Sequence, residues 1–191
     1  MKKLILFITF LFLPLTSFAQ QFKLEPLYGY ETTRREFPKP ANQITKSYLG
    51  VNILYGVPLL SLEFEVAQGT HTDHFVEQDL KVKSTTRRAM LGARSYPIVS
   101  KYYGWYFRAG MRAKQEIMDI TEAGVSRKET DPVYLDPYAG TGITITLGST
   151  FALNAGATLV YNRSADVERE SQRYDIQYTL SGSFKVGNRF Q

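Results

Sequence analysis

The chain has 191 residues, a formal net charge of +5, 43% hydrophobic residues and no cysteine. This length suits one domain with a complete core, and the lack of cysteine excludes disulfides and thiolate chemistry. Aromatic residues make up 14% of the chain, which favours strands over helices. The small excess of positive charge gives little support to a nucleic-acid partner.

Residues 1–19 have the pattern of a cleavable signal peptide. Two lysines precede the apolar run LILFITFLFLPLT, and the small residues Ser17 and Ala19 then have the spacing that signal peptidase reads. The run is too short to cross a bilayer comfortably as a helix. Cleavage would leave residues 20–191 with a net charge of 5 − 2 = +3. The pattern therefore predicts an exported mature protein.

The mature chain divides into eight segments in which apolar and polar residues alternate, beginning near residues 22, 48, 60, 88, 103, 134, 151 and 174. Each is about the 9 to 11 residues that a tilted strand needs to cross a bilayer. No segment has a sustained helical period. An even number of antiparallel strands can close without a free edge. The sequence therefore predicts an all-β fold, a single eight-stranded antiparallel up-and-down barrel over 20–191.

The connections between the segments alternate in length. Long polar stretches follow the first, third, fifth and seventh segments: TRREFPKPANQIT, THTDHFVEQ, QEIMDITEAGVSRKETD and RSADVERESQ. Short turns, among them SYPIVSK, follow the second, fourth and sixth segments. Outer-membrane barrels have short periplasmic turns and long external loops, so the lengths predict a barrel in the outer membrane.

The polar faces of the segments carry many glycines and charges of both signs, which predicts a narrow, filled lumen. An arginine turned to lipid near the midplane would cost about 2 to 4 kcal/mol, whereas charges enclosed together can pair. The alternative is a soluble periplasmic lipocalin-like barrel, with its apolar face turned inward around a ligand. The predicted lumen network comprises Glu63, Glu65, Arg88, Arg94, Arg108, Arg112 and Asp136.

Aromatic residues on the apolar faces gather near the strand ends, which is typical of the girdles at the two membrane interfaces. The predicted girdles comprise Phe22, Tyr103, Trp105, Phe151 and Phe184 toward the short turns, and Tyr28, Tyr30, Tyr161 and Tyr174 toward the long loops.

With these features the chain resembles the small outer-membrane β-barrel proteins of the OmpA-transmembrane-domain and OmpX-like group, over essentially the whole mature chain. The resemblance implies a structural or surface-interaction role with an unidentified surface partner. It also implies that the barrel-assembly machinery reads the last strand. There Tyr178, Leu180, Phe184, Val186 and Phe190 keep the alternating phase, while Gly182, Asn188 and a final Gln191 depart from the pattern.

The sequence predicts no catalytic, metal or cofactor site. His71 and His74 flank Asp73 in THTDH on an expected external loop, but a fourth spaced metal ligand is missing. A small-solute or hydrophobic channel and a lipid A-modifying enzyme remain as alternative functions. Lipopolysaccharide is an expected partner along with the other outer-membrane lipids, because Lys81, Lys83 and Arg87 would face outward near the external rim, where its phosphates lie.

Overall fold

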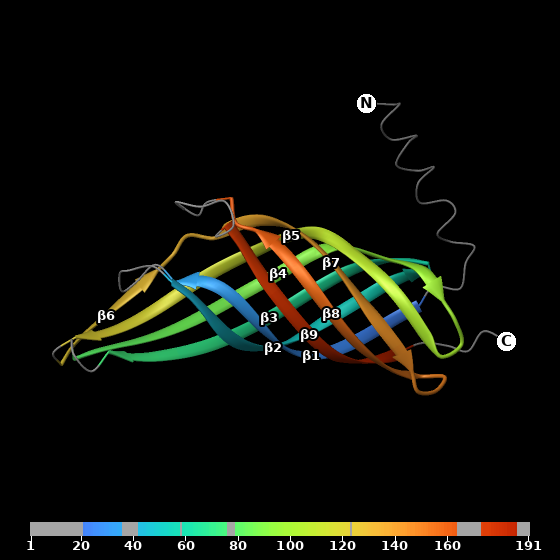
Figure 1. The fold of residues 1–191 in the computed structure, drawn as a ribbon, viewed down its shortest axis with the longest axis horizontal. Helices are drawn as coiled ribbons and strands as arrows, with labels where there is room; N and C mark the ends of the chain where they lie inside the picture. The colour runs from blue at the N-terminus through green and yellow to red at the C-terminus, as the bar shows by residue number, and fades with distance from the viewer. Residues whose placement is uncertain are drawn as a thin grey trace, which may run out of the picture.

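The computed structural model describes residues 21–35, 42–57, 59–75, 79–122, 124–163 and 173–186, and no side chain is described at 34, 35 and 42. Nine antiparallel strands form one closed sheet (Figure 1). The predicted signal peptide and Phe190 lie outside the described residues. The strands are β1 (Gln21–Arg35), β2 (Asn42–Val57), β3 (Leu60–Phe75), β4 (Leu80–Val99), β5 (Tyr103–Glu122), β6 (Val125–Thr130), β7 (Tyr134–Thr146), β8 (Phe151–Tyr161) and β9 (Tyr174–Val186).

Eight of these strands form the ring of the barrel: β1 to β5 and β7 to β9. Each pairs with its neighbour in the chain, except that β5 passes directly to β7. The ring closes between β1 and β9, from Phe22 opposite Val186 to Thr32 opposite Ile176. The predicted eight-stranded up-and-down barrel is therefore confirmed.

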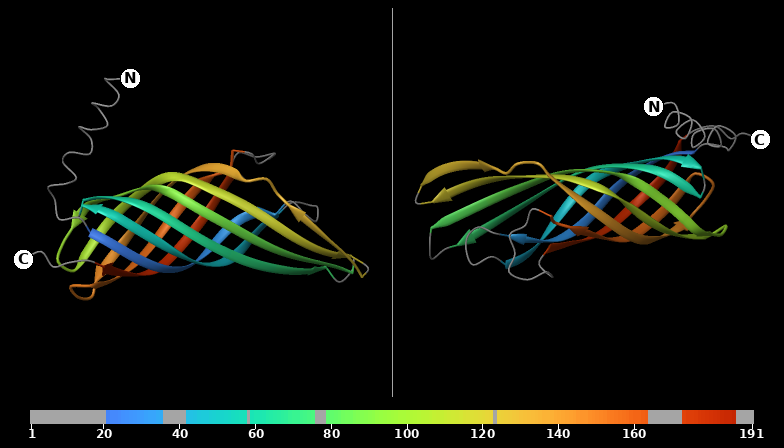
Figure 2. Two further views of the ribbon diagram at one scale, coloured as in Figure 1. Left: turned by 180° about the vertical axis from the view of Figure 1, so that it is seen from behind. Right: turned by 90° about the horizontal axis from the view of Figure 1, so that it is seen from above.

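The sheet continues past the ring as a four-stranded extension, although the sequence predicted loops there. Pairing of β2 with β3 ends at Tyr48 opposite Gly69, while β3, β4 and β5 run on together and β6 pairs with the end of β5. We call this extension the outer wing and define it as residues 70–75, 80–87, 115–122 and 125–130. Figure 2 shows it projecting from one end of the barrel. The polar stretches after β3 and β5 are thus largely strand.

The short turn predicted over SYPIVSK is also mostly strand, because β4 continues to Val99. Its register against β5 shifts between Ser95 and Ile98, a bulge that accommodates Pro97, which has no backbone N–H for the ladder. The bulge leaves the Tyr96 side chain buried, with 5% exposure. The connection that remains spans residues 100–102.

The interior is crowded, and glycines on the polar face make room for large side chains. A Cβ added to Gly29 would lie 2.5 Å from the Tyr48 ring, and one added to Gly142 would overlap the Tyr106 ring. Both tyrosines are nearly fully buried. These glycines therefore let aromatic rings cross the lumen.

Candidate functional site

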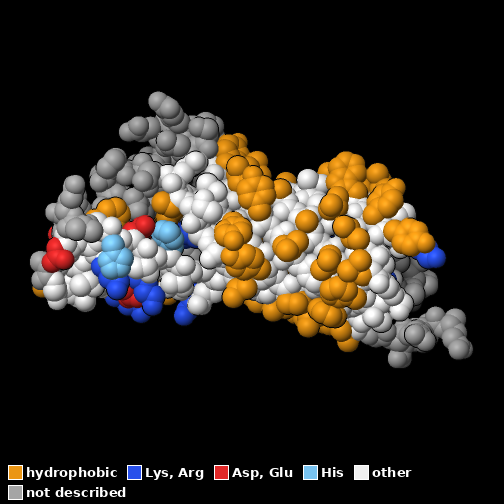
Figure 3. Space-filling view, turned by 60° about the horizontal axis from the view of Figure 1, so that its bottom comes forward, with side chains coloured by type: hydrophobic (Ala, Val, Ile, Leu, Met, Phe, Trp, Pro, Cys, Tyr) orange, Lys and Arg blue, Asp and Glu red, His pale blue; other side chains and the backbone are white. Residues whose placement is uncertain are grey.

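The outer wall of the barrel is apolar and exposed. Leu49 is 66% exposed and Leu91 is 63% exposed, and large hydrophobic side chains of all eight ring strands are exposed beside them. In Figure 3 hydrophobic side chains cover the barrel wall and give way to lysine, arginine and histidine side chains beyond it. Monomeric soluble proteins rarely expose a continuous apolar surface of this extent. Such a belt is the surface that a bilayer covers.

Aromatic side chains pair at both levels where the sequence predicted girdles. Toward the wing, the Tyr28 and Tyr30 ring centroids are 5.2 Å apart and those of Tyr161 and Tyr174 are 5.4 Å apart. Toward the short turns, the Phe151 and Phe184 centroids are 5.0 Å apart. Trp105 and Phe107 pair at 4.7 Å at the same end of the barrel.

The lumen holds a column of alternating acidic and basic side chains. At the short-turn end, Arg94 donates to Glu25 and to Glu63, each at 3.0 Å. Arg108 joins Glu63 to Glu65, and its Nη2 lies 2.9 Å from Glu65 Oε2. All five side chains are buried. Because these residues come from β1, β3, β4 and β5, the pairs connect strands across the barrel.

The column continues toward the wing end through two more arginines. Arg88 donates to Glu65 and to Glu31, each at 3.0 Å. Arg112 donates to Glu31 at 2.6 Å and to both Asp136 and Asp175 at 2.9 Å. Lys114 ends the series, with its Nζ 3.4 Å from Asp175 Oδ2.

Tyrosine rings pack against three of the arginines in the column. The guanidinium carbon lies 3.5 Å from the ring centroid for Arg88 and Tyr48, 4.4 Å for Arg94 and Tyr106, and 5.1 Å for Arg108 and Tyr138. These distances are within the range of cation–π attraction. The charges therefore sit in a packed, largely desolvated interior, where loss of one partner is costly.

The structure brings all seven residues of the predicted lumen network into this column. Sequence reasoning did not include Glu25, Glu31, Asp175 and Lys114 in that set. Glu25, Glu31 and Asp175 lie on the predicted polar faces of the first and last segments. Their positions in the alternating pattern therefore already indicated that their side chains point into the lumen. Their partners lie on strands that are distant in the chain. Closure of the ring brings these strands together, so the spacing of residues along the sequence does not reveal which residues pair.

The outer wing separates the residues of THTDH by strand alternation, where the sequence predicted one loop. His71 Nε2 lies 3.0 Å from Asp73 Oδ1, while His74 has the opposite parity on β3. Across the part of the chain that the structure describes, no three His, Asp or Glu side chains gather in a way that could hold a metal ion.

The opening of the lumen toward the wing has its own ion pair, above the apolar belt. Lys46 Nζ lies 2.6 Å from Glu116 Oε1 and donates to Ser84 Oγ at 2.8 Å. Burial alone would raise the pKa of the Glu116 carboxyl. The positive charges of Lys46 and Lys114 have the larger combined effect in the opposite direction, so the pKa lies below its ordinary value. The carboxylate therefore stays charged in this end of the lumen.

Lys81, Lys83 and Arg87 are exposed on the face of β4 that continues the lipid-facing wall. Arg87 is the first of them beyond the apolar belt, and its Nε donates to Gln68 Oε1 at 3.3 Å. Lys83 lies opposite Asp119 in the register with β5. The three cations thus form a line that runs outward from the membrane edge.

Within the described residues, no helix is long and apolar enough to cross a membrane. Among solved structures, outer-membrane proteins share the fold of this chain. OprG of Pseudomonas aeruginosa aligns with a TM-score of 0.57 at 8% identity, over 90% of this chain and 97% of that chain. A major outer-membrane protein of Thermus thermophilus aligns with a TM-score of 0.56 at 11% identity, over 88% of this chain and 100% of its own.

The chain has the fold of the small outer-membrane β-barrels. This barrel also resembles Ail, the attachment invasion locus protein of Yersinia pestis, with a TM-score of 0.55 at 9% identity over 88% of this chain and 99% of Ail. No protein-family model and no curated protein sequence matches the chain. The fold and the exposed apolar belt together place the barrel in the outer membrane, as predicted. The charged interior contradicts the lipocalin-like alternative, which needs an apolar interior.

Proposed function

We propose that this outer-membrane barrel engages a partner at the cell surface through its outer wing, without catalysing a reaction or conducting solutes. The observation that carries the proposal is the wing itself. The wing part of β4, residues 80–87, contains eight residues, which is about 26 Å of extended chain. A structure of that length beyond the belt has no role in spanning the membrane.

An extended segment can add a strand at an edge of the wing. Within the described ranges, β6 is the last strand of the sheet on one side. Sheet edges of this kind can take up an extended peptide as an added strand. All six residues of β6 are exposed, so this edge is accessible.

The filled lumen supports a role that is not transport. The column of ion pairs runs through the barrel, and its acidic and arginine side chains are buried. An eight-stranded barrel is only wide enough for side chains to fill its interior. Purified barrel in a planar bilayer should give no stable single-channel conductance, and reproducible conductance would contradict this part of the proposal.

The position of the two histidines bears on the catalytic alternative. An enzyme that modifies lipid A needs a nucleophile or base held at the lipid-facing surface. Both histidines of the chain lie on the wing part of β3 instead. The proposed absence of catalysis is tested by incubating the folded barrel with lipopolysaccharide, and a change in the mass of lipid A would refute it.

Photo-crosslinking in intact cells tests the surface role. A photoreactive residue at Lys128, on the exposed edge of β6, should give a crosslinked species of higher mass. The matched control carries the same residue at Thr150, in the short turn between β7 and β8 at the opposite end. Absence of a crosslink from Lys128, or an identical product from Thr150, would contradict the proposal.

We further propose that Lys81, Lys83 and Arg87 bind lipopolysaccharide phosphates, with Arg87 as the contact nearest the membrane. Guanidinium and ammonium groups form charge-assisted hydrogen bonds with phosphate. Ail, which shares this fold, has been solved with the heparin analogue sucrose octasulfate, so a polyanion is a reasonable ligand class for a basic outer surface. A triple-alanine variant should co-purify with less phosphorylated lipid, and unchanged retention would contradict the assignment.

The last strand supplies a second expected interaction. Tyr178, Leu180, Phe184 and Val186 of β9 are all exposed on the lipid-facing wall. We propose that the barrel-assembly machinery reads this alternation during insertion. Leu180→Asp, which keeps the strand length, should slow assembly in cells, as measured by the fraction that has changed mobility on unboiled gels.

A further inference from the structure

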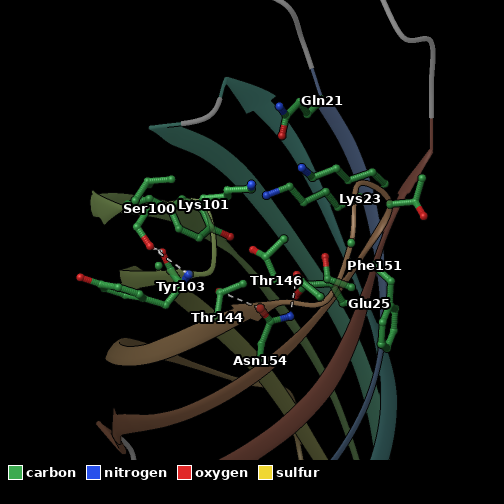
Figure 4. Close-up of a pocket in the computed structure, with 18 residues that line it drawn as sticks. Gln21, Lys23, Glu25, Ser100, Lys101, Tyr103, Thr144, Thr146, Phe151 and Asn154 are labelled. Carbon is green, nitrogen blue, oxygen red and sulfur yellow. Dashed lines mark hydrogen bonds between the residues drawn. The ribbon is translucent and has the colours of Figure 1, made fainter.

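A cavity of about 230 Å³ opens at the short-turn end of the barrel, opposite the wing. Its walls come from the first residues of β1, the end of β9 and the turns after β4 and β7. Figure 4 shows Lys23 and Lys101 reaching into it from opposite walls, above Glu25 and Asn154. The ion-pair column lies beneath these two residues, so the cavity is a blind mouth rather than the entrance to a pore.

The cavity collects positive charge that the neighbouring side chains do not neutralise. Lys23, Lys101 and Lys185 all line it. Lys23 and Lys185 lie directly opposite each other in the register of β1 with β9, an arrangement of like charges that is destabilising by itself. None of the three has an ion pair of 4.0 Å or less with a described residue. Lys23 Nζ instead lies 4.9 Å from the centre of the Tyr96 ring.

Among the described residues, Glu25 is the single carboxylate that lines the cavity, and it already has hydrogen-bond partners. Glu25 accepts hydrogen bonds from Arg94 at 3.0 Å and from the side-chain amides of Asn52 and Asn154, each at 3.1 Å. The connected column contains six carboxylates and five cations, an excess of one negative charge. Three lysines at its end outnumber that excess, which leaves the mouth positive.

The rest of the lining suits a ligand with hydroxyl groups. Hydroxyl side chains from the turns and strand ends surround the lysines. The Thr144 hydroxyl donates to Asn154 Oδ1 at 2.7 Å, which fixes the polar floor. One water molecule takes up about 30 Å³ in the liquid, so the cavity of about 230 Å³ has room for several water molecules. This is more space than a bare phosphate ion needs.

We propose that this mouth is a binding site for a small organic anion, a phosphate or carboxylate carried on a hydroxylated body such as a sugar. The anionic group would lie among Lys23, Lys101 and Lys185 and relieve their mutual repulsion, and the body would contact the hydroxyl-lined wall. This site is at the opposite end of the barrel from the wing and does not depend on the proposed surface role. The same phosphate chemistry could reach the mouth as a soluble periplasmic compound or as a phospholipid headgroup.

Calorimetric titration of the folded full chain in detergent micelles with glucose 1-phosphate tests the proposal. Wild-type protein should bind this probe at millimolar concentration and should not bind glucose. The variant Lys23→Gln/Lys101→Gln/Lys185→Gln should bind at least about tenfold more weakly. The control variant Lys81→Gln/Lys83→Gln/Arg87→Gln removes the same charge from the other end and should bind as wild type does.

Further variants separate a built site from general attraction. Substituting Arg for all three lysines keeps the charge and should keep binding, which guards against loss of binding through misfolding. Equal weakening in both glutamine variants, binding of glucose as tight as that of glucose 1-phosphate, or no binding by wild type would each overturn the proposal. Displacement of glucose 1-phosphate by phosphatidylglycerol vesicles but not by phosphatidylcholine vesicles would assign the site to a lipid headgroup. Lack of displacement would assign it to a soluble anion.

Discussion

Replacing Arg112 by methionine should lower the stability of the barrel more than replacing any exposed charged residue does. Arg112 is fully buried and donates to Glu31, Asp136 and Asp175. Without it, Glu31 keeps Arg88 and Asp175 keeps Lys114, but Asp136 loses its cation. Leaving one buried carboxylate without a cation should lower the free energy of unfolding by about 3 to 5 kcal/mol.

The loss can be measured by urea unfolding in lipid vesicles, followed by the fluorescence of the single tryptophan, Trp105, and by gel mobility before and after boiling. The double variant Arg112→Met/Asp136→Asn should recover at least about 1 kcal/mol, because it neutralises the orphaned carboxylate. The control is Arg127→Met, which breaks the exposed 3.2 Å pair with Glu129 and should change stability by at most about 1 kcal/mol. Equal losses for Arg112→Met and Arg127→Met, or no recovery in the double variant, would refute the reasoning.

Three further predictions concern the wall, the interior and the wing end. Leu91→Arg, in the middle of the apolar belt, should lower the free energy of unfolding by about 2 to 4 kcal/mol, whereas Leu59→Arg, in a short turn, should lower it by about 0 to 1 kcal/mol; equal losses in vesicle unfolding would contradict the belt. Gly29→Val should prevent the mobility shift of the folded barrel, because its side chain would overlap the Tyr48 ring, while a normal shift would contradict that packing. The pKa of Glu116 is lower in the folded protein than in the unfolded chain. Its ionised carboxylate therefore stabilises the fold above the unfolded pKa of about 4.3, and this stabilisation is lost as the pH falls through the pKa of the folded protein. Unfolding at neutral and acid pH should therefore show a smaller acid loss in Glu116→Gln, and an unchanged loss would contradict this.

The ring was predictable because period-two alternation is a local property of the chain. Tyr103, Trp105 and Phe107 alternate with Arg108 and its neighbours, and only one face of such a strand can meet lipid at acceptable cost. The prediction of strand parity therefore holds even on β4, where Met90 keeps to the lumen side at 0% exposure.

The wing was not predictable by the same reasoning, because both faces of its outer strand are exposed to water. VSRKET in β6 has no apolar face and is exposed throughout, so its composition is that of a loop. The strand forms because β5 runs past the belt and offers a partner from Ile117 to Glu122. The ion-pair column likewise needs the ring closure, since Glu31 of β1 meets Arg88 of β4 and Arg112 of β5.

The column has a consequence for the order in which the barrel assembles. Glu25 and Glu31 come from the first strand, and their arginine partners come from β4 and β5. A partly inserted sheet would hold these charges unpaired in contact with the hydrocarbon, at a cost that no single hairpin could offset. The strands are therefore expected to cross the membrane as one cooperative unit, with the closing of the first strand on the last as the event that neutralises the interior.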